Sequence, residues 1–158
     1  METEGRRAYL AALRLLGRRP LSVQELTRKL LRRGLSAEAA AEAVTRLLAE
    51  GALDDAAYAR AYVHDRLLFH PIGKRGLQAE LLRRGVPAEV VEEVLAGIDA
   101  EGEEELIRGL LSRRRATAGT TEEARRLGAW LLRRGFAPEA VRAVLGRGPA
   151  GGGEWPEC

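Results

Sequence analysis

LLRRG occurs at residues 30–34, again at 81–85 and again at 131–135, and this repetition determines how the chain is expected to fold. The similarity continues beyond the pentapeptide, as LLRRGLSAEAAAEAV, LLRRGVPAEVVEEVL and LLRRGFAPEAVRAVL. Each copy has the pattern of a helix end, a glycine able to take the left-handed conformation that closes a helix, and a second helix with apolar periodicity. We therefore expect the leucine pair to face the interior, the glycine to stop the helix, and the arginine pair to remain available for function.

Capping signals place the helices between these copies. Ser22 to Glu25 and Thr120 to Glu123 have the spacing of a capping box, which predicts that a helix begins at each serine or threonine. Ser36 is expected to cap the helix that follows the first copy, and Pro87 to open the helix that follows the second.

The chain is predicted to be all-α, because strand-like alternation of Val, Ile and Thr is not found in the sequence. We expect about nine helices in three tandem three-helix repeats, at residues 1–52, 53–98 and 99–148, followed by a disordered Gly/Pro-rich tail at 149–158. Stacked repeats bury their apolar faces mainly against their neighbours, so an elongated, curved array is expected.

The amino-acid composition limits the classes of function that are possible for this chain. The 158 residues are 46% hydrophobic and 31% charged, a globular balance, and the net charge is only +3. Arginine makes up 24 of the 26 basic residues. The planar guanidinium group of arginine is suited to binding phosphate and carboxylate. A GC-rich genome explains the high arginine content equally well. The single cysteine, Cys158, permits neither an internal disulfide nor a cysteine zinc site, and no apolar run is long enough to span a membrane. A cytoplasmic protein without a membrane partner is expected.

Catalytic and metal-binding patterns are weak. His64 and His70 do not have the spacing of a helical metal pair, and Asp54 and Asp55 at a helix start are better interpreted as caps than as an acid–base pair. The stretch Gly73–Gly76 (GKRG) is not a phosphate-binding P-loop, but its place before a helix makes it a candidate anion contact. We expect no enzyme activity, no metal and no cofactor.

Basic pairs near the helix ends have two interpretations. Cations in the last turn complement the negative end of the helix dipole, which is a structural role. Equivalent positions in stacked repeats also lie along one side of the array, where a stripe of arginines is suited to a phosphate backbone or an acidic protein groove. Few aromatic residues accompany these pairs, so base stacking is not expected to be the main binding mode.

The second repeat resembles the RecX family of regulators of the bacterial RecA recombinase. The segments LDDAAYARAYVHDRL (53–67) and GKRGLQAELLRRGV (73–86) carry the motif, and ALRLLGRRPLSVQELTRKLLRRG (12–34) is similar to the family's opening helix pair. The matching motif positions are Leu53, Asp54, Asp55, Tyr58, Ala59, Arg66, Gly73, Arg75, Leu77, Glu80, Leu81, Arg84, Gly85 and Val86. The resemblance covers most of residues 8–147.

This resemblance implies a non-enzymatic, monomeric protein that lodges in the groove of the RecA filament on single-stranded DNA, with weak direct DNA contact. It also implies inhibition of the RecA ATPase, strand-exchange and coprotease activities, and hence a role in DNA repair and the SOS response. The candidate partner- or DNA-binding residues are Arg32, Arg33, Arg66, Lys74, Arg75, Arg83, Arg84, Arg133 and Arg134. The alternative is a helix-turn-helix-like regulator of duplex DNA, but the helices after the three glycines are rich in Glu and Ala, a poor recognition surface.

Overall fold

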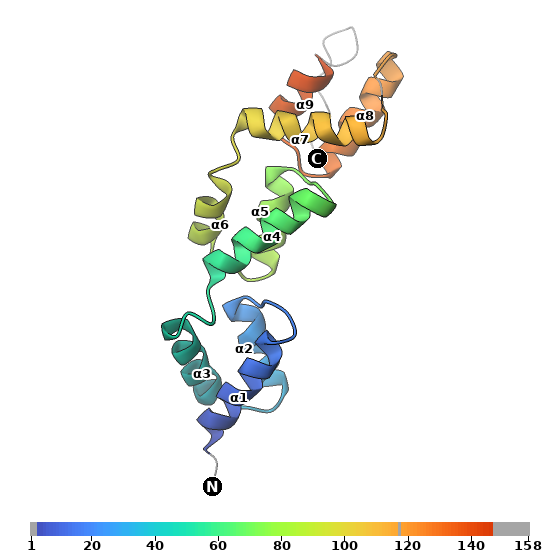
Figure 1. The fold of residues 1–158 in the computed structure, drawn as a ribbon. Coiled ribbons are helices and arrows are strands. Elements are labelled where there is room, and N and C mark those ends of the chain that lie inside the picture. Colours follow the sequence, from blue (N-terminus) through green and yellow to red (C-terminus); the bar gives the residue numbers. More distant parts are fainter. Residues whose placement is uncertain (1–2, 117, 147–158) are drawn as a thin grey trace. The chain divides into compact units, whose positions relative to one another are not determined.

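The computed structural model describes residues 3–116 and 118–146, and within these residues it contains nine α-helices and no strand. The helices are α1 (Glu4–Leu16), α2 (Val23–Arg32), α3 (Ala37–Ala49), α4 (Asp55–Phe69), α5 (Lys74–Arg83), α6 (Ala88–Leu95), α7 (Ala100–Arg113), α8 (Thr121–Arg133) and α9 (Pro138–Leu145) (Figure 1). The prediction of an all-α chain is confirmed. None of these helices, over the described ranges, has the length and apolar character that crossing a membrane requires.

Internal packing divides the chain into two compact units. Unit 1 comprises Met1–Tyr62 with Leu81–Val94, and unit 2 comprises Val63–Glu80 with Leu95–Cys158. The division falls within α4, α5 and α6, so the repeat boundaries expected from the sequence remain a prediction, as does the curved array. The predicted disordered tail at 149–158 lies outside the described residues.

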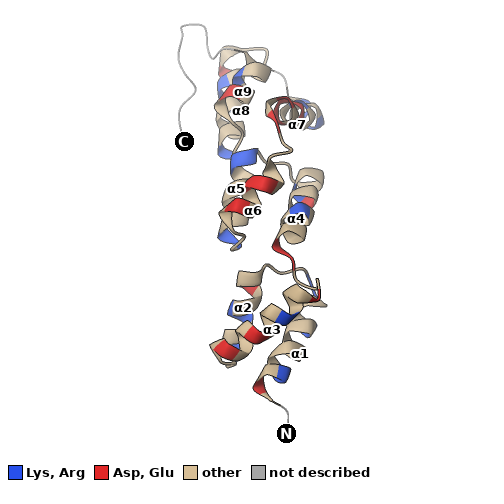
Figure 2. Cartoon of the chain, turned by 90° about the vertical axis from the view of Figure 1, so that its left-hand side faces the viewer, with Lys and Arg blue, Asp and Glu red and all other residues tan. Residues whose placement is uncertain are grey.

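Helices α1, α2 and α3 pack side by side in unit 1 (Figure 2). Their core is aliphatic, with Leu26, Leu30 and Leu47 fully buried. Ser22 and Ser36 cap α2 and α3 as predicted, and the α2 capping box is complete because Glu25 also accepts the backbone N–H of Ser22. Polar N-caps thus start the helices, and leucines on one face hold them together.

All three LLRRG copies end their helix in the same way. Gly34, Gly85 and Gly135 have φ values of 81°, 83° and 82°, in the left-handed region that favours glycine. Each glycine N–H donates to the carbonyl of the second leucine, and the next residue's N–H donates to the carbonyl of the first leucine, the pattern of a Schellman motif. The predicted stop signal is therefore confirmed.

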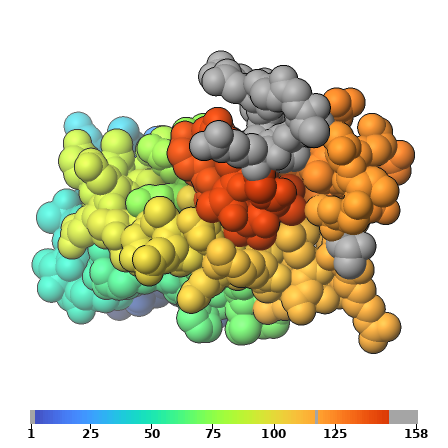
Figure 3. Space-filling model, turned by 90° about the horizontal axis from the view of Figure 1, so that it is seen from above, coloured from blue at the N-terminus to red at the C-terminus, as the bar shows by residue number. Residues whose placement is uncertain are grey.

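The last three helices form the core of unit 2. Ile107, Leu131 and Val141 are fully buried there, and Phe136, the residue after the third glycine, is 1% exposed. Helix α9 packs against α7 and α8, and Figure 3 shows the red surface of α9 lying against the orange surface of α7. The core of α7, α8 and α9 is thus mainly aliphatic, like that of α1, α2 and α3, but includes the ring of Phe136.

Candidate partner-binding surface

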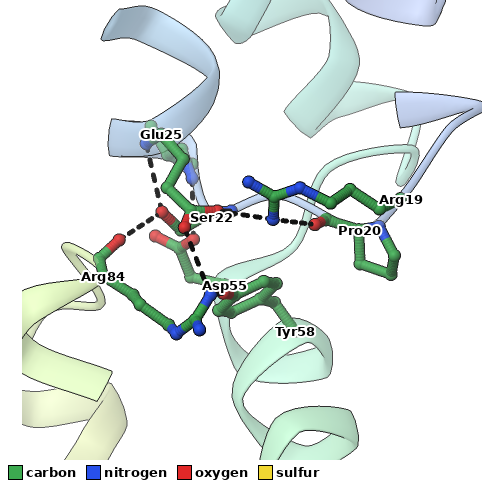
Figure 4. Close-up of polar contacts among 8 residues, drawn as sticks. Arg19, Pro20, Ser22, Glu25, Asp55, Tyr58 and Arg84 are labelled. Carbon is green, nitrogen blue, oxygen red and sulfur yellow. Dashed lines mark hydrogen bonds and ion pairs between the residues drawn. The ribbon is translucent and has the colours of Figure 1, made fainter. Parts of the chain in front are cut away.

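The start of α2 is held by two hydrogen bonds within unit 1, one to the second LLRRG copy and one to α4 (Figure 4). The Ser22 hydroxyl donates to the backbone carbonyl of Arg84 over 2.6 Å. The backbone N–H of Val23 donates to the Asp55 carboxylate over 2.9 Å. The first N–H group of α2 is thereby matched with an acceptor from α4, and the Ser22 hydroxyl is matched with an acceptor just after the end of α5. We call Ser22, Val23, Asp55 and Arg84 the first joint.

The side chain of Arg84 adds further contacts to this joint. Its guanidinium donates to the Tyr58 hydroxyl over 3.3 Å, lies 3.6 Å from the Glu25 carboxylate, and stacks 4.6 Å from the ring centroid of Tyr62. Arg19 lies at the same distance, 3.6 Å, from the other Glu25 oxygen. Burial alone lowers the pKa of Arg84, but its contacts with the Tyr58 and Tyr62 hydroxyls more than offset this, so that the pKa lies above its usual value. Arg84 is therefore a charged, partly exposed residue whose guanidinium is engaged by three side chains of unit 1.

An equivalent joint occurs at the start of α5, within unit 2. The backbone N–H of Gly73 donates to the carbonyl of Arg134 over 2.8 Å, and the N–H of Lys74 donates to the Glu103 carboxylate over 3.2 Å. The guanidinium of Arg134 donates to the carbonyl of Pro71 over 2.9 Å. We call Gly73, Lys74, Glu103 and Arg134 the second joint.

The two joints use matching positions of the repeat. Ser22 and Gly73 both immediately precede a middle helix, and each donates to the carbonyl of the second arginine in the LLRRG copy of the following repeat, Ser22 through its hydroxyl and Gly73 through its backbone N–H. Asp55 and Glu103 both belong to the first helix of the following repeat, and each accepts the first N–H of that middle helix. In the second and third copies, the second arginine of LLRRG is therefore part of the packing between elements, a role that the sequence did not reveal.

The candidate anion contact at Gly73–Gly76 already has an anion from the chain itself. Glu103 is 5% exposed, and one of its oxygens accepts both the N–H of Lys74 and that of Ala137, which lies 3.0 Å away at the start of α9. The Lys74 ammonium donates to the carbonyl of Ile98 over 3.0 Å. Free N–H groups at a helix start do favour an anion, and here that anion is a buried carboxylate.

Replacing Glu103 by alanine is expected to lower the free energy of unfolding by about 2 kcal/mol, because two N–H groups at helix starts lose a charged acceptor. Glu103→Gln keeps an acceptor oxygen and should lose less. Glu101→Ala is the matched control, since Glu101 is exposed in the same first turn of α7. Urea denaturation at neutral pH measures the differences; equal losses for Glu101→Ala and Glu103→Ala would contradict the role of Glu103.

Arg66 is paired within unit 2. Its guanidinium makes a two-pronged contact with Glu80, with nitrogen–oxygen distances of 3.0 and 2.8 Å, and also donates to the carbonyl of His70 over 3.2 Å. This geometry fixes the end of α4 against α5 and uses most of the donors of the arginine. Arg66 therefore resembles Arg84 and Arg134 in having a structural role.

The remaining predicted arginines are available to a partner. Each is exposed, and none makes a side-chain hydrogen bond or ion pair with another residue in the described ranges. We call these residues, Arg32, Arg33, Arg75, Arg83 and Arg133, the free arginines. Figure 2 shows basic residues on α2 and acidic residues on α3, both within unit 1.

Metal-binding and catalytic groups were searched over the same ranges. Three or more His, Cys, Asp or Glu side chains do not gather into a possible metal site anywhere in residues 3–116 or 118–146. His64 lies beside Asp65 on the surface, and His70 is exposed at the end of α4. Asp54 caps its own helix by accepting the N–H groups of Ala56 and Ala57, so its interpretation as a cap is confirmed.

The described helices and the two joints define an all-α protein of short packed helices, and the comparisons with known proteins agree. A family model described as "RecX, first three-helix domain" matches residues 8–47, and one described as "RecX, second three-helix domain" matches residues 54–95. Two crystal structures of RecX proteins have similar folds. One, from Lactobacillus salivarius, has a TM-score of 0.76 at 19% identity, over 90% of this chain and 94% of the other. The second has a TM-score of 0.77 at 20% identity, over 89% and 71%.

Sequence relatives lead to the same family. A protein from Trichlorobacter lovleyi named "Regulatory protein RecX" is 40% identical over 87% of this chain and 92% of its own length. A protein of the same name from Mycobacterium avium is 37% identical over 87% of this chain and 82% of its own. The chain belongs to the RecX family.

Proposed function

We propose that this protein is a non-enzymatic regulator that binds the RecA nucleoprotein filament and inhibits its ATPase, strand-exchange and coprotease activities. By doing so it modulates recombinational DNA repair and the SOS response. The observation that carries the proposal is similarity over 87% of the chain to relatives named as regulatory proteins. The protein acts in the cytoplasm as a monomer.

The free arginines supply the means of binding. Because their guanidinium groups are not engaged by carboxylates among the described residues, they can pair with carboxylates of a protein groove or with DNA phosphates. Each exposed contact is weak by itself, but several in one folded body add through effective concentration. Direct contact with the single-stranded DNA is a minor part of the binding.

The exposed surface of α6 is unfavourable for the alternative function, regulation of duplex DNA. Glu89, Glu92 and Glu93 are exposed on this helix, which follows the second LLRRG glycine. A carboxylate-rich helix repels the phosphates that border the major groove. A duplex gel shift titrated with salt is expected to show no specific complex.

The proposal is tested by adding the protein to the single-strand-dependent ATPase of RecA. The rate should fall as the protein approaches the concentration of RecA protomers, because bound protein occupies the filament. An unrelated ATPase that depends on single-stranded DNA serves as the control, and its rate should not change if the protein acts on RecA and not on the DNA. If the RecA rate does not fall at any stoichiometry, the proposed function is wrong.

A further inference from the structure

Helix α7 ends in three successive arginines, Arg113, Arg114 and Arg115, and all three are exposed. Several other arginines pair with a glutamate one turn away on their own helix, as Arg108 does with Glu104 over 3.1 Å. The three arginines have no such partner, because the sequence has no acidic residue three or four positions before or after any of them. Among the described residues their side chains make no hydrogen bond or ion pair. Three like charges therefore lie together without a carboxylate from the described chain.

Arg115 closes α7 in the conformation that glycine has in the LLRRG copies. Its φ is 50°, and in the described ranges every other residue with a positive φ is a glycine. Its N–H donates to the carbonyl of Ser112, and the N–H of Ala116 donates to that of Leu111, which is again the Schellman pattern. A side chain in the left-handed region costs free energy that glycine avoids. Folding alone would favour glycine here, so the strain points to a role for the arginine side chain itself.

The middle arginine of the three lies on an aromatic ring. The guanidinium of Arg114 is 4.2 Å from the ring centroid of Trp130. The guanidinium of Arg134 is 5.0 Å from the same centroid and is fixed by its hydrogen bond to the carbonyl of Pro71. Trp130 is partly buried against the core of unit 2, so its ring is a firm support for the exposed Arg114. We call Arg113, Arg114, Arg115 and Trp130 the Arg–Trp cluster.

We propose that the Arg–Trp cluster binds single-stranded nucleic acid, with Arg113 and Arg115 on phosphates and a base stacked over Arg114. Guanidinium groups pair well with phosphates, and a guanidinium held on an indole ring offers a flat surface on which a base can stack. A duplex does not offer the face of a base, because its bases stack on one another. An acidic peptide could pair with the arginines, but a carboxylate side chain has no ring to stack.

This inference rests on the proposed function for the role of the contact, which is the minor binding of single-stranded DNA, but its test needs no RecA. The probe is a fluorescein-labelled oligothymidylate, and its fluorescence anisotropy at constant salt measures the affinity. The same strand with abasic sites in place of its bases, and a duplex of the same length, are the reference ligands. The wild type is expected to bind the strand about tenfold more tightly than the abasic strand, and more tightly than the duplex.

Two variants remove the stacking surface. Arg114→Ala is expected to bind the strand about tenfold more weakly. Trp130→Phe should lose less, because phenylalanine keeps a ring but supports a cation less well than tryptophan does. Arg108→Ala is the matched control, since it removes the same charge from the same helix at an arginine that is already paired with Glu104. This control should bind like the wild type.

Arg115→Gly separates binding from folding. Glycine relieves the left-handed strain, so the midpoint of urea denaturation should rise. The affinity for the strand should nevertheless fall about threefold, and the slope of log affinity against log salt should fall by about 1, because one phosphate contact is lost. Binding by Arg115→Gly with the affinity and salt slope of the wild type would overturn the role of the strained arginine.

The other outcomes are equally distinct. Equal binding of the abasic strand, or wild-type affinity of Arg114→Ala, would overturn the proposal. Displacement of the strand by polyglutamate as effectively as by unlabelled oligothymidylate would assign the cluster to an acidic protein surface instead. A protein that inhibits the RecA ATPase but does not bind the strand would refute the cluster alone, and one that binds the strand without inhibiting RecA would refute the proposed function alone.

Discussion

Replacing Gly135 by alanine is expected to lower the free energy of unfolding by about 3 kcal/mol or more. Two costs combine at this position. Its φ of 82° is strained for any residue with a Cβ, which alone costs about 1 kcal/mol. A Cβ on Gly135 would also overlap the backbone nitrogen and Cα of Gly76, which are not free to move as a side chain is.

Gly34→Ala separates these two costs. Gly34 has nearly the same φ, 81°, but no atom lies within 4 Å of the position of its Cβ. It should therefore lose only about 1 kcal/mol, the cost of the left-handed conformation. Urea denaturation of the two variants measures the difference. Equal losses would contradict the close approach of the third LLRRG copy to the start of α5.

Reversing the charge of the free arginines is expected to weaken inhibition of the RecA ATPase by about a hundredfold or more, because like charges then face each other in the complex. The variant replaces Arg32, Arg33, Arg75, Arg83 and Arg133 with glutamate. Because these side chains are exposed and make no ion pair within the described residues, the helical content and the thermal unfolding should change little.

The control reverses Arg125 and Arg126 in α8. Both are exposed and lie within 3.8 and 3.6 Å of Glu122, so this variant also places new carboxylates on the surface, but outside the free arginines. Inhibition should be retained. Equal inhibition by the two variants and the wild type would place the interface elsewhere, and equal loss in both would show a general effect of charge.

Much of the fold could be predicted because its signals are local. The capping boxes at Ser22 and Thr120, and the glycines that close the middle helices, act within four residues of their own position. Apolar periodicity then sets which side of each helix is buried. Such signals fix helix ends and type without reference to the rest of the chain.

The sequence could not predict which arginine of an LLRRG pair is engaged within the chain and which is free, because this depends on contacts between distant segments. Ser22 and Arg84 are separated by 62 positions, and Arg134 and Pro71 by 63. The sequence presents both arginines of a pair as equivalent basic residues. Only the packed structure shows that Arg84 and Arg134 are engaged while Arg83 and Arg133 remain free.

The prediction of an interior leucine pair was wrong for the first two LLRRG copies, where Leu31 is 43% exposed and Leu82 is 44% exposed. Exposure of this second leucine was missed for a related reason. Periodicity places Leu31 and Leu82 next to buried leucines, but whether a neighbouring helix reaches far enough to cover them is a tertiary property. An internal comparison of the three copies gives no signal either, because the letters are identical and only Leu132 is buried.

The central claim is that, in the second and third LLRRG copies, the second arginine holds the chain together while the first faces the partner, and arginine-specific chemical modification read by mass spectrometry tests it most directly. In the free protein, Arg84 and Arg134 should react slowly and Arg83 and Arg133 rapidly, since only the first two are engaged. Adding the RecA filament on single-stranded DNA should then protect Arg83 and Arg133. Rapid modification of all four in the free protein, or unchanged reactivity of Arg83 and Arg133 in the saturated complex, would contradict the claim.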